Sequence, residues 1–447
     1  MLFRSRDISG FTAQVPGRED DGYENLSLNV RTGGQITPRF SLEVSLRYED
    51  TENELDGFNL TGPVGDADYV SFTEKVTAGL TGDINVIDGV WQQKLRVTYL
   101  DTDLENLAFG APNGRTASDK LGLYSDTVLT LDEDHRLTLI ADYEETDFTQ
   151  EGEATFFGDP NQEQSRDNAG LGFDYVGELV GDLYANASVR RDFSSGFQDF
   201  TSWRFGLSAG IPDVGARLFA SVARGQKAPT FSEQFGFFNG NFIGNQNLTP
   251  ERSTQWEVGL ELAPSESLSV AATLFFARLT NEINSFVALP GGLFTAENVD
   301  GRSKRSGVEV TFDASLSDTL SLKGHYTYVR STAPEFEGSD VRVRELRRPR
   351  HQAAILTAWQ ATDAFSINLD FDYTGSAADT RFLDVPPFSE AVTLDDYFLV
   401  RLAASYQLNT HVTLTARVEN LLDEAYQDVV GFNTAGASAY AGVRINF

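Results

Sequence analysis

Apolar and polar side chains alternate along many segments of this chain. In residues 40–48 an apolar residue stands at every even position and a polar one at most of the odd positions between. A period of two places successive side chains on opposite faces of an extended strand, so each such segment predicts a strand with one apolar and one polar face. The same alternation occurs in residues 94–99, 308–316, 365–373 and 412–418.

The last ten residues are the most informative of these segments. Ala439, Ala441, Val443, Ile445 and Phe447 share one face, and polar residues with Tyr440 share the other. One face suits lipid and the other a water-filled lumen. An edge strand of a soluble sandwich would alternate similarly, so this pattern alone leaves both readings open.

The connections favour the membrane reading. About 20 strands are joined by links that alternate between short turns and long loops. The short turns are residues 34–38, 132–134, 211–214, 264–266, 317–318 and 409–410; the long loops are residues 50–68, 147–166, 225–251, 281–302, 331–350 and 376–393. Tight turns at one rim and long loops at the other are typical of outer-membrane barrels, and loops this long are uncommon in compact soluble domains.

Aromatic residues sort toward two levels on the predicted apolar face. Those near the long loops are Tyr48, Tyr99, Tyr143, Tyr328 and Tyr373, and those near the short turns are Phe40, Trp91 and Phe365. Aromatic side chains favour the headgroup levels of a bilayer. We therefore predict an all-β fold, a transmembrane antiparallel β-barrel in the outer membrane of a Gram-negative bacterium, with the long loops outside the cell.

Composition agrees with this fold and limits the function. The chain has 447 residues, no Cys, one Met and a formal net charge of −31. No apolar run reaches the ~18 residues of a membrane helix, and a barrel strand does not need one. The negative charge argues against nucleic acid as a partner. It is compatible with a cationic or metal-chelating cargo, although solvated acidic loops explain it more simply.

Two motifs resemble the TonB-dependent receptors, with the cobalamin-receptor branch looking closest. The first is residues 224–238 (RGQKAPTFSEQFGFF) with residues 247–261 (NLTPERSTQWEVGLE), and the second is residues 420–426 (NLLDEAY) with the closing strand. The resemblance implies a receptor barrel over residues 1–447, with about 20 of the family's roughly 22 strands. The residues that match the family signature are Lys227, Pro229, Asn247, Pro250, Glu251, Trp256, Glu257, Asn420, Asp423, Tyr426 and Phe447.

We interpret most of these signature residues as scaffold. Pro229 and Pro250 cannot donate to a strand ladder, so they should bracket the long loop between two strands. Direct contact of either proline with cargo is the alternative. Phe447 and the last strand resemble the signal by which bacterial barrels reach the barrel-assembly machinery.

The loop between the prolines also holds the predicted ligand-binding residues. Exposed rings beside side-chain amides can stack on a flat ligand and bond its periphery, which suits a large, partly apolar metal chelate. The alternative is that the rings pack loop against loop. The candidates are Phe235, Phe237, Phe238, Asn239, Asn241, Asn245 and Asn247.

Metal and catalytic sites have weaker support. Asp20, Asp21, Asp50 and Asp56 lie in the first two loops and could supply oxygen ligands to calcium. Their spacing follows no fixed motif, so we expect no cofactor beyond such a loop calcium. The four histidines are scattered and there is no Cys, so no catalytic residues are assigned and we expect no enzyme.

From its first ten residues we expect the sequence to start within the predicted barrel, without a signal peptide. From the resemblance we expect the plug domain and the TonB box to be absent from residues 1–447, so that contact with the TonB complex would require a missing plug. The favoured function is uptake of a scarce chelate, such as cobalamin or siderophore-bound iron, driven by TonB in the complete receptor. The alternatives are a plugless passive pore or non-functional fragment, and a surface binding or adhesion barrel. Outer-membrane lipid and lipopolysaccharide are the expected surroundings.

Overall fold

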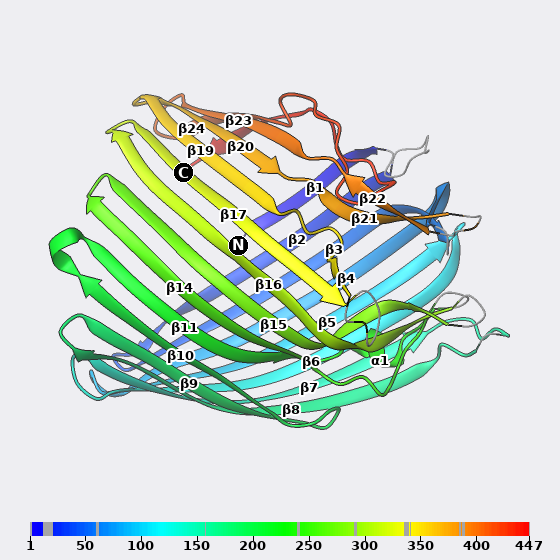
Figure 1. Ribbon diagram of the computed structural model, residues 1–447, viewed down its shortest axis with the longest axis horizontal. Helices are drawn as coiled ribbons and strands as arrows, with labels where there is room; N and C mark the ends of the chain where they lie inside the picture. Colours follow the sequence, from blue (N-terminus) through cyan, green and yellow to red (C-terminus); the bar gives the residue numbers. More distant parts are fainter. Residues whose placement is uncertain are drawn as a thin grey trace.

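The chain forms one long antiparallel meander of strands (Figure 1). The computed structural model describes residues 2–11, 21–59, 62–156, 158–238, 242–289, 293–334, 339, 341–383, 386 and 389–446; of these, the side chains of residues 2–11, 21, 56–59, 62–66, 286 and 300 are outside the description. Twenty strands make up the meander: β1 (Leu2–Phe11), β2 (Asp21–Thr37), β3 (Phe40–Asn59), β4 (Gly62–Ile87), β5 (Trp91–Ala108), β6 (Ala111–Thr130), β7 (His135–Glu151), β8 (Gln162–Val180), β9 (Leu183–Ser194), β10 (Phe200–Ile211), β11 (Ala216–Lys227), β14 (Glu251–Ser265), β15 (Leu268–Ala288), β16 (Phe294–Ser317), β17 (Leu320–Pro334), β19 (His351–Thr362), β20 (Phe365–Thr374), β23 (Tyr397–Gln407), β24 (Val412–Glu419) and β25 (Ser438–Ile445).

The remaining elements belong to the loops. They are the 3-10 turn η1 (Pro212–Val214), the short helix α1 (Phe231–Phe235), and the short strands β12 (Phe237–Phe238), β13 (Phe242–Ile243), β18 (Arg342–Arg344), β21 (Ala377–Phe382) and β22 (Ser389–Leu394). Among the described residues, no helix combines the length and the apolar character needed to cross a bilayer.

Each meander strand pairs with the next one along the chain. The pairing continues across the long loops, where β11 meets β14, β17 meets β19 and β20 meets β23. The oblique strands curl around a common axis, with the short turns at the left and the longer connections at the right of Figure 1. The prediction of an antiparallel barrel of about 20 strands is confirmed. None of the pairings in the described part of the chain joins β1 to β25, and most side chains of β25 are exposed on both faces.

The ladder register shows which face meets lipid. Val44 lies opposite Leu80, which lies opposite Val97, which lies opposite Leu123. All four side chains are exposed, which in a folded protein indicates an apolar environment around this face. The predicted outward residues Leu42, Leu95, Ile367 and Leu369 have the same parity in their ladders. The other parity lines the interior with polar rows such as Glu43, Thr81, Arg96 and Tyr124.

Several predicted long loops are in fact continued strands, which corrects the sequence analysis. β3 and β4 stay paired through most of residues 50–68, where Glu54 faces Val70. β6 pairs with β7 up to Glu151, and β15 pairs with β16 from Ala288 onward. Above the membrane, pairing between strands still satisfies the backbone N–H and C=O groups. Water surrounds both faces of a strand there, so apolar alternation is not required. Alternation therefore ends at the bilayer boundary while the strands continue.

Candidate ligand-binding rim

The loop of residues 228–250 folds inward at the rim that carries the longer connections. β11 ends at Lys227 and β14 begins at Glu251, so Pro229 and Pro250 bracket the loop as expected. Both prolines are buried. Inside the loop, Thr230 accepts a hydrogen bond from the backbone of Glu233 (3.1 Å), whose carboxylate accepts from the Thr230 N–H (2.8 Å). This reciprocal capping fixes the start of α1.

The inner face of β7 and β8 holds the loop in place. Gln150, Gln162 and Arg166 have the parity opposite to the outward residues Leu139 and Tyr143. The side-chain amide of Gln150 donates to the Phe237 carbonyl (2.7 Å) and accepts from the Phe237 N–H (3.0 Å). Gln162 donates to the carbonyl of Phe235 and to Gln150. The loop is therefore bonded to the wall of the barrel lumen, not to its outer surface.

Arg166 forms a further buried contact with the loop. The buried guanidinium donates to the Pro229 carbonyl (3.0 Å) and to the Gln234 side chain, and its carbon lies 4.4 Å from the centre of the Phe231 ring. The Phe231 ring also stacks on Phe148 with 5.3 Å between centres. A buried cation requires such carbonyl and ring partners, since no carboxylate among the described residues pairs with it.

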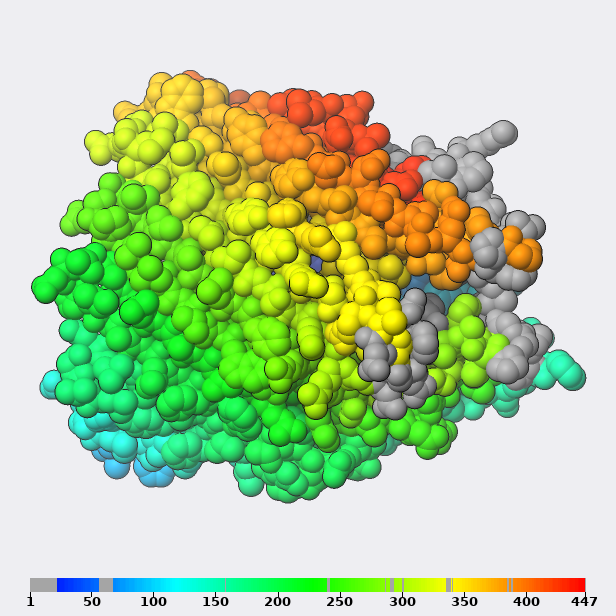
Figure 2. All heavy atoms as spheres, in the orientation of Figure 1, coloured from blue at the N-terminus to red at the C-terminus, as the bar shows by residue number. Residues whose placement is uncertain are grey.

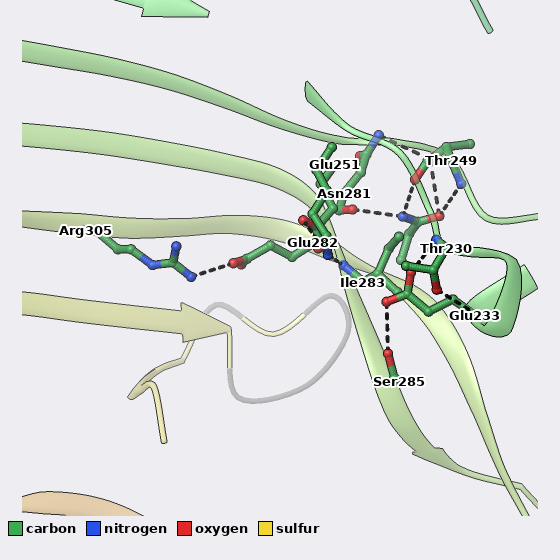
Figure 3. Close-up of polar contacts among 11 residues, drawn as sticks. Thr230, Glu233, Thr249, Glu251, Asn281, Glu282, Ile283, Ser285 and Arg305 are labelled. Atoms are coloured by element: carbon green, nitrogen blue, oxygen red, sulfur yellow. Dashed lines mark hydrogen bonds and ion pairs between the residues drawn. The ribbon is translucent and has the colours of Figure 1, made fainter. Parts of the chain in front are cut away.

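The loop's other flank rests on the hairpin of β15 and β16 (Figure 3). Glu233 accepts a bond from Ser285 (3.2 Å), and Glu251 accepts from the backbone N–H of Ile283 (2.8 Å). The second oxygen of Glu251 lies 3.5 Å from the Lys227 ammonium. Thr249 and Asn298 bond each other, and Asn298 also donates to the carbonyl of Asn281.

The predicted ligand-binding residues divide into packed and exposed groups. The ring of Phe237 is buried and that of Phe235 is half-buried, 6.3 Å from Phe231. Asn245 is half-buried and donates to the Ala296 carbonyl (3.0 Å), and its side-chain oxygen accepts from the backbone of Asn247 (3.0 Å). The side chains of Phe238 and Asn247 are exposed. Asn239 and Asn241 lie outside the described residues.

The neighbouring loop of residues 152–161 adds an exposed ring and an anion. Phe156 is 99% exposed. Hydrogen bonds from the backbone N–H and side-chain amide of Asn161 lower the pKa of the Asp159 carboxyl. Aromatic and charged groups thus stand together at the mouth of the barrel.

Sequence reasoning did not single out Phe156. It also did not single out Gln150 and Arg166, which hold the loop of residues 228–250 and which we call the clamp residues. Nothing local marks them, because their partners lie more than 60 residues away.

Other signature residues take structural positions. Trp256 lies on the outward face beside Phe276 (5.5 Å between ring centres), and Glu257 lies on the lumen face, where it accepts from Ser221 (3.2 Å). Asn420 and Asp423 adopt positive φ angles of 45° and 53°, and each accepts a backbone N–H with its side chain, from Glu424 and Ala437. Such local bonds explain why Asn and Asp stand where an αL turn is needed.

Tyr426 packs its ring 4.2 Å from that of Tyr397, and burial is the main reason that the pKa of Tyr426 is raised. Phe447, the predicted assembly signal, lies outside the described residues.

Within the described part of the chain, no group of three or more His, Cys, Asp or Glu side chains could hold a metal ion. Asp50 is exposed in the middle of β3. Asp20 and the side chains of Asp21 and Asp56 lie outside the description. The loop calcium therefore stays a prediction.

Comparison with known proteins identifies the family. The model of the TonB-dependent receptor-like β-barrel family matches residues 68–421. Because this match covers well over half of the sequence, the chain belongs to that family. The family consists of receptors and transporters, so the chain is a receptor barrel and not an enzyme.

Solved structures share the fold at low sequence identity. The siderophore receptor PirA from Acinetobacter baumannii is 15% identical, with a TM-score of 0.78 over 98% of this chain and 72% of that one. A mutant of the ferric enterobactin receptor PfeA from Pseudomonas aeruginosa is 18% identical, with a TM-score of 0.77 over 100% of this chain and 72% of that one. The ferric-catecholate import receptor Fiu from E. coli K12 is 14% identical, with a TM-score of 0.76 over 100% and 79% of the two chains.

Proposed function

We propose that this chain is the outer-membrane barrel of a receptor that takes up an iron–siderophore chelate in a TonB-dependent manner, and that the inward-folded loop of residues 228–250 contributes to the binding site. The observation that carries the proposal is the fixing of this loop over the lumen by Gln150, Gln162 and Arg166. Because the loop is bonded at several backbone positions, it loses little conformational entropy when its exposed side chains bind a ligand.

Phe238 is the exposed ring best placed to contact cargo. It lies one residue after the clamped Phe237, and its ring centre is 6.1 Å from that of Phe242. The two ring planes are inclined at 53°, so together they offer two apolar faces to the aromatic groups of a catecholate. The similar structures include a ferric enterobactin receptor and a ferric-catecholate import receptor, which supports iron chelates over cobalamin as cargo. Cobalamin stays a prediction from the motifs.

Equilibrium binding to the purified receptor tests the proposal. Ferric enterobactin should bind saturably, and cyanocobalamin should not compete with it. Phe238→Ala should weaken binding by about three- to tenfold, since one aromatic contact contributes about 0.5–1.5 kcal/mol. Phe40→Ala, at the opposite rim, is the matched control and should leave the affinity unchanged. Binding of cyanocobalamin alone, or equal affinities for both variants, would contradict the proposal.

A further inference from the structure

The outward face of the barrel carries a basic patch in a protein whose net charge is −31. The parity that places Val258, Leu274 and Trp256 on the outer face also places basic residues there, level with Trp256 in the ladder or on its long-loop side. We call this set the outer basic patch; it comprises Arg224 of β11, Arg252 of β14, Arg278 of β15, Arg302 and Lys304 of β16, and Arg330 of β17.

The register brings these charges together. Arg278 lies directly opposite Lys304. On the strand beside Arg278, Arg252 lies one outward-facing position nearer the long loops than the residue opposite Arg278. On the strand beside Lys304, Arg330 lies one outward-facing position nearer the short turns than the residue opposite Lys304. Because the strands run obliquely (Figure 1), this stepwise shift keeps the four residues near one level of the barrel. The outer surface of β14 to β17 is turned toward the viewer in Figure 2.

None of the six has an ion-pair partner among the described residues. Among the described meander strands, the other outward-facing Lys and Arg residues, Arg115 and Arg191, are each paired with carboxylates, Asp103 and Asp199 respectively. Like charges placed directly opposite on one face of a sheet are unfavourable, so a counter-charge from outside the chain would stabilise Arg278 and Lys304. The buried Nε of Arg252 also has no hydrogen-bond partner.

Apolar and aromatic residues border the patch on the side toward the membrane. The Arg278 guanidinium lies 5.5 Å from the Trp256 ring and 5.3 Å from the Phe276 ring. One outward position further from the long-loop rim stand Val258, Leu274 and Val308 on adjoining strands. Aromatic residues favour the headgroup level, so the cations lie where lipid phosphates lie and the apolar residues lie where acyl chains lie.

The rest of the same rim has the opposite charge. On the outer faces of β3 to β8, Asp50 lies opposite Glu74, and Asp119 lies opposite both Asp101 and Asp147. The basic patch and these acidic pairs therefore lie on separate groups of strands.

Taking the chain as a membrane barrel, as the proposed function does, we infer that the outer basic patch binds the phosphate groups of an anionic glycolipid of the leaflet around the long-loop rim. Guanidinium groups match phosphate geometry and bond it bidentately. Two or more phosphates on one headgroup would span the charges on adjacent strands.

Native mass spectrometry of the detergent-solubilised receptor tests this inference, with diphosphoryl lipid A as the probe. The double variant Arg278→Gln, Lys304→Gln should lose about thirtyfold in affinity, because each cation near such a surface contributes about fivefold and the two factors multiply. Arg278→Lys should retain most of the binding. Arg217→Gln, which removes a lumen-facing cation on β11, is the matched control and should bind like the wild type.

Three further arms decide the outcome. Monophosphoryl lipid A should bind more weakly than the diphosphoryl form, and inorganic phosphate at the same concentration should not compete. Ferric enterobactin affinity should be unchanged in the double variant, which separates this inference from the proposed function. Equal lipid retention by the double variant and the control, full competition by inorganic phosphate, or loss of receptor dimers in place of loss of lipid would overturn the inference. The last result would show that the outer basic patch of one copy meets the acidic pairs of another.

Discussion

The side-chain amide of Gln150 bonds both the N–H and the carbonyl of Phe237, 87 residues further along the chain. A single side chain thereby imitates one step of a β-ladder and attaches the loop of residues 228–250 to the inner wall of β7. The contact is buried, so both backbone groups depend on it.

Gln150→Leu should release the loop. Two buried backbone groups lose their partner, at a cost of about 1–3 kcal/mol each if no water replaces it. We expect faster proteolysis within residues 228–250 and weaker binding of ferric enterobactin, while the barrel itself stays folded. Gln360→Leu removes a solvent-exposed amide bond at the short-turn end of β19 and serves as the control. A loop equally resistant to protease in both variants would show that the clamp is dispensable.

Val44→Arg tests the lipid-facing assignment. Val44 lies on the outward face midway between the aromatic levels of Phe40 and Tyr48, so a charge there should cost about 2–4 kcal/mol in the folding of the barrel into lipid vesicles, measured by urea titration. Ser45→Arg places the same charge on the adjacent, lumen-facing residue and should cost much less. If the two variants were equally destabilised, the inside–outside assignment would be wrong.

Asp379 joins three connections of the long-loop rim. Its fully buried carboxylate accepts from Arg347 (3.0 Å), from the backbone of Thr380 (2.8 Å) and from that of Val430 (2.9 Å). Asp379→Ala should cost about 2–4 kcal/mol, since a charged group with three bonds is removed from the interior. Hydrogen exchange should accelerate at both Thr380 and Val430.

Glu390→Ala is the control for this variant. It removes a solvent-exposed ion pair with Arg381 on the same hairpin, and such pairs contribute only about 0–1 kcal/mol. Unchanged exchange at Val430 in Asp379→Ala would show that the carboxylate does not link these connections.

The sequence predicted the membrane-spanning part of the fold well, because there each strand separates lipid from water. Val44 and Val97 alternate with polar neighbours for that reason, and their parity agrees with the register. The same period of two predicts that Arg278 and Lys304 of the outer basic patch face outward, because they continue the outward parity of Leu274 and Val308. Only their opposition across two strands needed the structure.

The loops were predictable only in outline. Above the bilayer both faces of a strand meet water, so apolar alternation ends near Asp50 although β3 continues to Asn59. The rings of Phe235 and Phe237 and the exposed ring of Phe238 look alike in sequence. What separates them is contact with Gln150 and Gln162 from a distant hairpin, and no local pattern encodes such a contact.

The most direct test of the central claim, that an iron chelate binds at the rim formed by the long loops, uses the absence of Cys from the chain. Asn247→Cys introduces a single thiol on the exposed loop, and Thr319→Cys introduces one in the short turn between β16 and β17. Each is labelled with the same fluorophore and titrated with ferric enterobactin, whose iron centre quenches nearby fluorescence. The account predicts saturable quenching of the label at position 247 and none at position 319. Quenching only at position 319, or at neither position despite measured binding of the chelate, would contradict it.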